Sequence, residues 1–405
     1  MAKASSLFFL MITLFHLVSG YAIRNGCYTS IISFGDSLAD TGNLKQLATI
    51  YNRSFLYFRP PYGETFFGQP TGRCSNGRLV IDFLAESLGL PLVPPYVGSD
   101  TRKMEGGVNY AVAGATALGS GFLEGRGIYN SITNASLGVQ VEWFKKSLSS
   151  FCATASDCKY FFERSIILVG EIGGNDYNRP LALGKSIEEV ESYVPFVVST
   201  IVLAIKDIID LGAKTLVIPG NLPIGCSAAY LTMYYDSDIK EYDNTTGCLI
   251  RLNKFAEYYN ELLQRELHRI QELHPNVHII YADYYNAAMQ FYTSPSKYGF
   301  TNGALKACCG GGGPFNCNRS VACAHPSSTV CAQPNTYANW DGNHLTEAAY
   351  KLIYKSVFEG SYSVPRFNSL CLSQTSHERD YGAFWRKVMQ FIRLVYNFNS
   401  NNFVL

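Results

Sequence analysis

Five short runs of apolar residues recur along the chain, and the segments between them are long enough to hold helices. The runs are rich in Ile and Val and lie at residues 30–34, 108–112, 166–169, 215–218 and 277–281. Their apolar character is continuous rather than alternating, which is typical of parallel strands that helices cover on both faces. The intervening segments include predicted helices at residues 80–88, 193–211 and 252–273. This order of strands and helices predicts an α/β fold with a doubly wound sheet.

Length and composition agree with one large domain that acts on a small molecule. The chain has 405 residues, of which 47% are hydrophobic and 16% are charged, so it can bury a large core. Lys and Arg total 33 against 32 Asp and Glu, which leaves no bulk positive field. We therefore expect a small molecule as the partner, and neither nucleic acid nor an acidic lipid surface.

The N-terminus has the pattern of a secretory signal peptide. Lys3 precedes an apolar run over residues 7–18, and the small residues Ser19, Gly20 and Ala22 follow it. A membrane anchor is the alternative, but the run is shorter than the roughly 20 apolar residues that span a bilayer. We predict a signal peptide over residues 1–22, a secreted protein, and no integral membrane segment once the signal is removed.

Cysteines and glycosylation motifs fit the same compartment. The chain has twelve cysteines, an even number that favours disulfides in an oxidising environment. Five of them crowd a Gly-rich segment, namely Cys308, Cys309, Cys317, Cys323 and Cys331. A thiolate metal site is the alternative there, but the spacing of zinc ligands is missing, so we predict disulfides and no metal. Four Asn-x-Ser/Thr motifs predict glycans on surface loops, at Asn52, Asn134, Asn244 and Asn318.

Polar, Gly-rich segments follow three of the predicted strands. They occupy residues 35–43, 113–116 and 170–176, each beginning where an apolar run ends or directly after it. Ligands of doubly wound sheets bind where loops leave the carboxyl ends of the strands. We therefore expect the chemistry of this protein at that edge of the sheet.

The far end of the chain supplies an acid and a base in one tight turn. Asp341 and His344 are three residues apart, directly before a predicted helix at residues 347–357. A hydroxyl nucleophile needs a base beside it, a group that orients the base, and donors for the oxyanion of the attacked ester. The turn offers the first two, because Asp341 is placed to fix the tautomer of His344.

These segments resemble the plant GDSL (SGNH) esterase/lipase family. The resemblance is carried by the Gly-Asp-Ser-Leu block around Ser37, by Gly114, by the Gly-Gly-Asn-Asp block around Asn175, and by the Asp341-x-x-His344 block, and it extends over roughly residues 27–371. Within the family, the chain is most similar to the branch of acetylajmalan esterase and sinapine esterase. The family resemblance implies a flavodoxin-like, three-layer α/β/α sandwich with a five-stranded, mostly parallel sheet.

The resemblance also implies roles for individual residues. Ser37 would be the nucleophile, His344 the general base and acid, and Asp341 its orienting partner. The oxyanion hole would consist of the backbone N–H groups of Ser37 and Gly114 and the side-chain amide of Asn175, with no cofactor or metal. The chain lacks the G-x-S-x-G motif of the other large serine hydrolase fold.

The predicted function is hydrolysis of small acetyl or hydroxycinnamoyl esters of specialised metabolites through an acyl-serine intermediate. One alternative is an acyltransferase that passes the acyl group to an alcohol, and another is a lipase. The absence of an evident hydrophobic lid favours soluble esters. Residues 372–405 lie beyond the family-like region and combine basic and apolar residues, which fits either an interfacial helix or a poorly packed tail, and we assign them no role.

Overall fold

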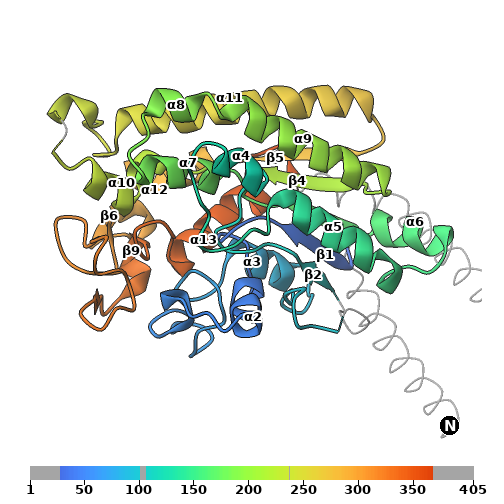
Figure 1. Ribbon diagram of the computed structural model, residues 1–405, viewed down its shortest axis with the longest axis horizontal. Coiled ribbons are helices and arrows are strands. Elements are labelled where there is room, and N and C mark those ends of the chain that lie inside the picture. The colour runs from blue at the N-terminus through green and yellow to red at the C-terminus, as the bar shows by residue number, and fades with distance from the viewer. Residues whose placement is uncertain (1–27, 101–105, 237, 368–405) are drawn as a thin grey trace, which may run out of the picture.

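The computed structural model describes residues 28–100, 106–236 and 238–367, and the predicted signal peptide and C-terminal tail lie outside these ranges. Within them, six strands form a central sheet in the order β10-β5-β4-β3-β1-β2 (Figure 1). Their bounds are β1 Ser30–Phe34, β2 Gly107–Asn109, β3 Ser165–Val169, β4 Thr215–Pro219, β5 His278–Ala282 and β10 Ser363–Val364. Five strands are parallel, and the two-residue β10 pairs antiparallel with β5 at the edge. The predicted α/β class is confirmed.

The five predicted strands are present, but the second is shorter than predicted and the sixth was not predicted. β2 ends at Asn109 rather than at residue 112. The chain beyond it still donates from Val112 N–H to the Gly35 carbonyl oxygen at 3.1 Å. However, the Gly35 N–H binds the Gln140 side-chain oxygen at 2.8 Å, so the ladder does not continue. The Gln140 amide thus takes the place of a neighbouring strand at the end of β1.

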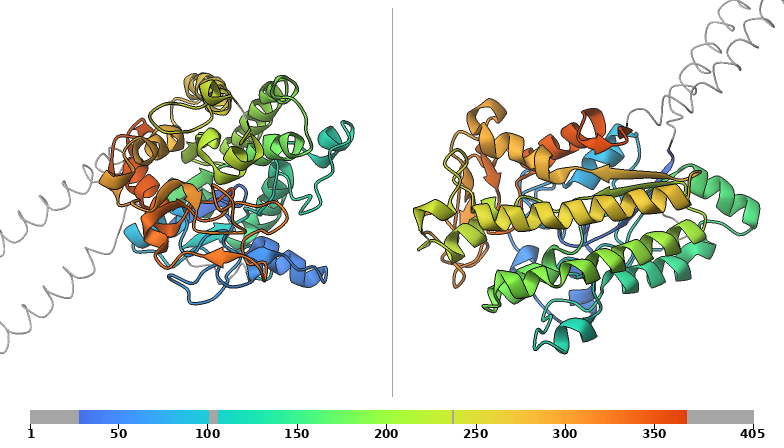
Figure 2. Two further views of the ribbon diagram at one scale, coloured as in Figure 1. Left: turned by 90° about the vertical axis from the view of Figure 1, so that its left-hand side faces the viewer. Right: turned by 90° about the horizontal axis from the view of Figure 1, so that it is seen from above.

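Helices cover both faces of the sheet, which makes the three layers of the sandwich. One face carries α5 Leu137–Ser147, α9 Val194–Asp210 and α11 Ile250–Leu273. The opposite face carries α3 Val80–Ser87, α12 Tyr284–Thr293 and α13 Glu347–Tyr354. Figure 2 shows α9 and α11 running side by side along the sheet. The remaining helices are α2 Asn43–Ile50, α4 Ser120–Glu124, α6 Ala155–Glu163, α7 Gly174–Ala182, α8 Ile187–Glu191 and α10 Ala228–Met233.

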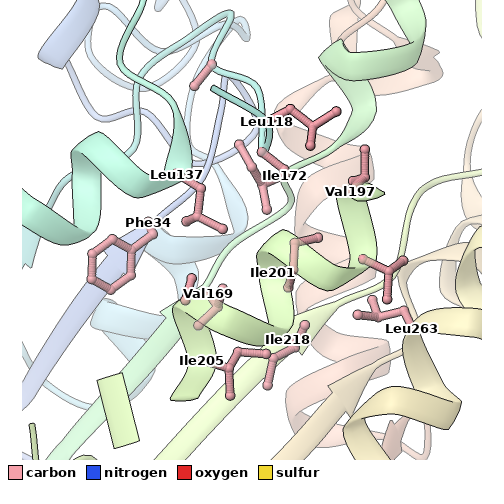
Figure 3. Close-up of a cluster of buried hydrophobic side chains, with 14 of the residues drawn as sticks. Phe34, Leu118, Leu137, Val169, Ile172, Val197, Ile201, Ile205, Ile218 and Leu263 are labelled. Atoms are coloured by element: carbon pink, nitrogen blue, oxygen red, sulfur yellow. The ribbon is translucent and has the colours of Figure 1, made fainter. Parts of the chain in front are cut away.

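Alternate residues along the strands pack into two separate hydrophobic cores. Phe34, Val169 and Ile218 point to the face of α5, α9 and α11, where Figure 3 shows them among Leu137 and Ile205. The residues between them in the strands belong to a second buried cluster on the face of α3, α12 and α13. Both faces are buried, so both are apolar, which is why the strands read as continuous apolar runs.

The segment Ile187–Asp210 is long and apolar enough, with a mean hydropathy of 1.7, to cross a membrane by length and composition alone. It contains α8 and α9, and half of it is buried inside the protein. α9 packs against α5 and α11, which is the position of a core helix in an α/β sandwich.

Four disulfides cross-link loops of the described chain. Among the described residues, the pairs are Cys152–Cys158, Cys226–Cys248, Cys308–Cys331 and Cys309–Cys323. The last two lie within the predicted Gly-rich loop, which also holds the short strands β6 Gly303–Ala307, β7 Cys309–Gly310, β8 Thr329–Val330 and β9 Tyr337–Asn339. The predicted disulfides in this loop are thus confirmed. Cys74 and Cys317 are free thiols.

Candidate active site

The three Gly-rich segments meet at the carboxyl edge of the sheet. The chain runs from β1 to β2 on one side and returns to β3 on the other side of β1. The loops after β1 and β3 therefore diverge and leave a crevice at this switch point, which is where ligands of such sheets bind. The turn between β9 and α13 reaches the same edge and completes the site.

Ser37 lies in the turn that follows β1. Gly35 opens this turn with a φ of 136°, and a Cβ there would lie 2.9 Å from the Glu171 carbonyl oxygen, so no larger residue fits without a shift. The Asp36 carboxyl group accepts the Leu38 N–H at 2.9 Å, and the Asp36 carbonyl oxygen accepts the Asp40 N–H at 2.9 Å. These bonds hold the turn in one conformation.

Asp341 and His344 lie in the turn before α13, which Thr346 begins as the N-cap residue. Asp341 Oδ1 accepts the backbone N–H of His344 at 2.8 Å. The His344 ring lies 2.8 Å from Asp341 Oδ2 through Nδ1 and 2.9 Å from Ser37 Oγ through Nε2. Ser37, His344 and Asp341 thus form one hydrogen-bonded chain, although 307 positions separate Ser37 from His344.

The electrostatics of this chain favour a proton on His344. Burial opposes a charged ring, but the charge and hydrogen bond of Asp341 outweigh it and raise the pKa of His344 above its ordinary value. Burial also works against ionised Asp341, yet His344 and further hydrogen bonds hold the pKa of Asp341 below its usual range. With Asp341 ionised, the hydrogen-bond pattern assigns the Nδ1 proton to the bond with Asp341 and leaves Nε2 to accept from Ser37.

Tyr62 is a further partner of Asp341 that the sequence did not single out. Its hydroxyl group donates to Asp341 Oδ2 at 2.7 Å, and its ring is fully buried. The two residues are 279 positions apart, so no local spacing could have paired them. Tyr62 fills a lone pair of the carboxylate and thereby fixes the plane in which Asp341 faces His344.

Two backbone N–H groups predicted as oxyanion donors line the crevice without a protein acceptor. Within the described part of the chain, neither Ser37 N–H nor Gly114 N–H donates to another protein group. Gly114 has a φ of 82°, and a Cβ there would lie 2.8 Å from the Ile132 side chain. The close packing of this loop therefore requires a glycine.

The third predicted donor, Asn175, is already engaged. Its side-chain nitrogen donates to Asp36 Oδ2 and to the Ala115 carbonyl oxygen, both at 3.0 Å. An amide nitrogen has two hydrogens, so a substrate oxygen has to share one of them with Asp36 or Ala115. Asn175 lies beside Ser37 in the crevice, but its donor is less open than the backbone ones.

Asp36 and Glu171 form a buried carboxyl pair beneath Ser37. Burial raises the pKa of Asp36 to about 6, and a hydrogen bond from Glu171 partly offsets this. Burial and the neighbouring Asp36 charge raise the pKa of Glu171 well above its usual range. The two carboxyl groups share a hydrogen bond, and Asp36 also accepts from the Asn175 side chain. The sequence placed both residues at the strand ends but gave no sign that they pair.

Two other buried carboxylates hold the loops together. Asp40 Oδ2 accepts the Ala113 N–H at 2.8 Å, which ties the loop after β2 to the loop after β1. Asp176 accepts the N–H groups of Ala117 and Leu118 at 2.8 and 3.0 Å, which ties the same loop to the start of α7. Asp40 belongs to the polar segment of residues 35–43 and Asp176 to the Gly-Gly-Asn-Asp block, and their contacts explain how Gly114 is held between Ser37 and Asn175.

The cleft above the hydrogen-bonded chain has two lobes that share Tyr57, Tyr230 and the His344 ring. The inner lobe has a volume of about 240 Å³ and contains Ser37, Gly114 and Asn175 in its wall. The outer lobe has a volume of about 470 Å³, and its wall comprises residues 54–57, the tip of α10 and the disulfide-bonded loop, with Phe55, Met233, Cys309, Cys323 and Val321 among its side chains. Volumes of this order suit small-molecule ligands.

The four predicted glycosylation residues, Asn52, Asn134, Asn244 and Asn318, are exposed. Asn318 is also part of the outer lobe's wall, where a glycan would stand at the mouth of the cleft. The free thiol of Cys317 lies next to it, and burial raises its pKa to about 11, so it stays protonated. Cys317 therefore adds no nucleophile to the cleft.

Comparisons with known proteins show the family to which the chain is similar. A family profile described as GDSL-like Lipase/Acylhydrolase matches residues 31–357, from the second residue of β1 to beyond α13. GDSL esterase/lipase At1g28570 of Arabidopsis thaliana is 50% identical over 376 residues, covering 91% of this chain and 96% of that protein. GDSL esterase/lipase At1g28590 of the same plant is 53% identical over 346 residues, covering 85% of this chain and 86% of that protein. A solved structure of a catalytic mutant of Axe2, an acetylxylan esterase from Geobacillus stearothermophilus, is 12% identical with a TM-score of 0.35, covering 83% of this chain and 95% of that one.

Proposed function

The chain belongs to the GDSL-like lipase/acylhydrolase family and is a carboxylic ester hydrolase, and from this premise we propose that Ser37 is its nucleophile. In this proposal His344 is the general base and acid, and Asp341 orients it. The observation that supports these roles is the continuous chain of hydrogen bonds from Ser37 Oγ through both ring nitrogens of His344 to Asp341. A hydroxyl group, a base and an orienting carboxylate in this order are what acyl transfer through serine requires.

The reaction follows from the positions of the protons. His344 Nε2 takes the proton of Ser37 Oγ as the oxygen attacks the ester carbonyl carbon, and the carbonyl oxygen becomes an oxyanion. The N–H groups of Ser37 and Gly114 and the Asn175 amide would donate to that oxyanion. The protonated His344 then gives its proton to the leaving alcohol, and an acyl-Ser37 remains. Water attacks this acyl group through the same base, which releases the acid and restores the Ser37 hydroxyl group.

The proposed substrates are small acetyl or hydroxycinnamoyl esters of specialised metabolites. The inner lobe, at about 240 Å³, is of a size for a compact acyl group next to Ser37, and the outer lobe leaves space for an alcohol part. This substrate class also rests on the sequence resemblance to the branch of acetylajmalan esterase and sinapine esterase. The outer lobe combines apolar side chains such as Phe55, Met233 and Val321 with the polar Asn178, Asn318 and Arg319, so hydrolysis of lipid esters is the second candidate function.

We also propose that the enzyme is secreted. The support is the signal-peptide pattern of residues 1–22, the disulfides of the described domain, and four exposed glycosylation motifs. In this proposal the mature protein consists of the hydrolase domain over residues 27–371 and the tail of residues 372–405.

Product partitioning tests hydrolysis against acyl transfer, because both reactions share the acyl-Ser37 intermediate. Purified enzyme is given acetyl and hydroxycinnamoyl esters with and without acceptor alcohols, and free acid and new ester are quantified together. We expect free acid to dominate at every acceptor concentration and to vanish in Ser37→Ala. New ester that dominates at low acceptor concentration would instead identify an acyltransferase, since an alcohol can outcompete water only if it is bound and oriented.

A further inference from the structure

Arg179 places a partly buried positive charge beside the candidate oxyanion hole. It is the sixth residue of α7 and lines the inner lobe together with Ser37, Gly114 and Asn175. Its Nη2 atom donates to the Gly114 carbonyl oxygen at 3.0 Å. Burial lowers the pKa of Arg179, and the neighbouring Tyr57, Asp176 and Asp36 partly offset this. A guanidinium group remains charged under these conditions, so the inner lobe contains a fixed cation.

The charge of Arg179 lacks a partner of opposite sign. Within residues 28–367 as described, no ion pair joins it to a carboxylate, and its enclosed Nε atom has no hydrogen-bond acceptor. Asp176 is three residues earlier on the same helix, but its oxygens accept the N–H groups of Ala117 and Leu118. A half-buried guanidinium group without an ion-pair partner costs free energy, which a ligand carboxylate bound to its accessible part recovers.

A role as a mere support for the Gly114 loop does not account for Arg179. The Gly114 carbonyl oxygen already accepts a hydrogen bond from the Asn130 side chain at 3.0 Å, so it has a partner without the guanidinium. The loop is also held by the two Asp176 bonds on its other side. An apolar side chain at this position would fill the space at no electrostatic cost.

A second guanidinium group, that of Arg319, lines the cleft at its rim. Apart from the His344 ring, the positive charges among the residues that line the two lobes are Arg179 and Arg319. Arg319 stands at the exposed rim, where its Nη2 donates to the Ala182 carbonyl oxygen at 2.9 Å. The carboxyl groups of the lining are Asp36, Glu171 and Asp341, and each is hydrogen-bonded within the site. Within the described residues, Arg179 and Arg319 are thus the positively charged side chains of the lining that form no ion pair.

We propose that Arg179 binds a carboxylate carried by the substrate, so that the preferred esters of this enzyme are anionic. This inference rests on the proposed function, because it assigns a specificity to the site in which Ser37 attacks the ester. A carboxylate on either the acyl or the alcohol part presents two oxygens to the guanidinium group, with Arg319 drawing the same charge into the cleft.

Matched pairs of esters that differ only in the charge test the proposal and distinguish the two sources of the carboxylate. The acyl arm uses mono-4-nitrophenyl terephthalate and its methyl ester, in which the carboxylate cannot reach the ester carbon, and the alcohol arm uses O-cinnamoyl glycolate and its methyl ester. In at least one arm, we expect wild-type kcat/KM to be about ten- to a hundredfold higher for the anionic ester. Arg179→Gln should remove most of that ratio, and Arg179→Lys, which keeps the charge, should restore part of it.

The control is Arg269→Gln, an exposed α11 residue paired with Glu266, which should leave the ratio at the wild-type value. A wild-type ratio near one in both arms, or an equal loss for both esters of a pair in Arg179→Gln, would overturn the inference while the esterase assignment stands. Hydrolysis that persists in Ser37→Ala would instead overturn the proposed function. If Arg179→Gln does not fold, the wild-type enzyme still tests the proposal. The ratio of kcat/KM for the anionic ester to that for its methyl ester should fall as salt is raised to about 0.5 M. A ratio that does not change with salt would contradict the proposal.

Discussion

The two lobes of the cleft are built in different ways. The inner lobe is formed by residues that follow β1, β2 and β3 and by the turn before α13, so the sheet itself fixes Ser37, Gly114 and Asn175. The outer lobe is formed by loops without strands of the central sheet, and the Cys309–Cys323 disulfide crosses its wall. Under the proposed function, the inner lobe, which the sheet fixes, performs the reaction, and the cross-linked outer lobe selects the alcohol part of the substrate.

The largest effect is expected from Ser37→Ala, which removes the nucleophile from the rigid lobe. We expect kcat to fall by about 10⁴- to 10⁶-fold, because the members of such a chain act as a unit. Ser37→Ala combined with His344→Ala should lose no more than either variant alone. Thermal unfolding of the variants should stay near that of the wild type, since Ser37 is only partly buried. Additive losses in the double variant would contradict the proposed unit.

Asn175→Ala tests the donor that is shared with Asp36. We expect a loss of about 10²- to 10³-fold in kcat with KM little changed, which is the effect of removing one oxyanion donor. Asn178→Ala on the same helix is the matched control, because the Asn178 side chain accepts the Tyr230 hydroxyl group at 2.6 Å and lies between the lobes. The loss of kcat in Asn178→Ala should be clearly smaller than that in Asn175→Ala. Equal losses would mean that Asn175 only shapes the helix.

The pH profile tests the electrostatics of the inner lobe. His344 must be neutral to accept the Ser37 proton, and its pKa is raised, so kcat/KM should fall about tenfold per pH unit below a pKa that lies above the ordinary value of roughly 6.5. A raised pKa keeps the His344 ring protonated, and therefore unable to accept the Ser37 proton, up to a higher pH. A profile that is flat from about pH 8 down to about pH 4 would rule out His344 as the base.

The smallest catalytic effect is expected in the outer lobe, from Cys309→Ser combined with Cys323→Ser. The pair closes a loop of 14 residues, so its loss should destabilise the fold by about 3 kcal/mol and raise KM several-fold with kcat retained. Cys152→Ser with Cys158→Ser is the control, because that shorter loop lies away from the cleft. It should lower the unfolding temperature but leave KM unchanged. A loss of kcat in the Cys309–Cys323 variant that the control does not show would contradict the assignment of the reaction to the inner lobe alone.

The sequence predicts the inner lobe more fully than the outer lobe. Four of the five strands match their apolar runs to within one residue at each end, because burial on both faces makes a strand visible locally. The segments that contain Ser37 and Asn175 were located because they follow such strands, and the family resemblance implied the roles of the two residues. The short β10 went unpredicted, since its two residues, Ser363–Val364, have no pattern of their own.

Contacts between distant segments explain the remaining gaps. The Tyr62–Asp341 bond joins residues 279 positions apart, and the Asp36–Glu171 pair forms only when β1 and β3 lie side by side. The outer lobe depends on which cysteines pair, a choice that sequence alone leaves open. The unpartnered charge of Arg179 is likewise a property of its surroundings and is not visible in its place along the chain.

The central claim is that Ser37 forms the covalent intermediate, and mapping of a fluorophosphonate adduct tests it most directly. Wild-type enzyme is labelled, digested and analysed by mass spectrometry, with Ser37→Ala treated in parallel. We predict a single adduct on the peptide that contains Ser37, formed more slowly as His344 becomes protonated at low pH, and no adduct in Ser37→Ala. An adduct on another serine, or labelling that persists in Ser37→Ala, would contradict the account.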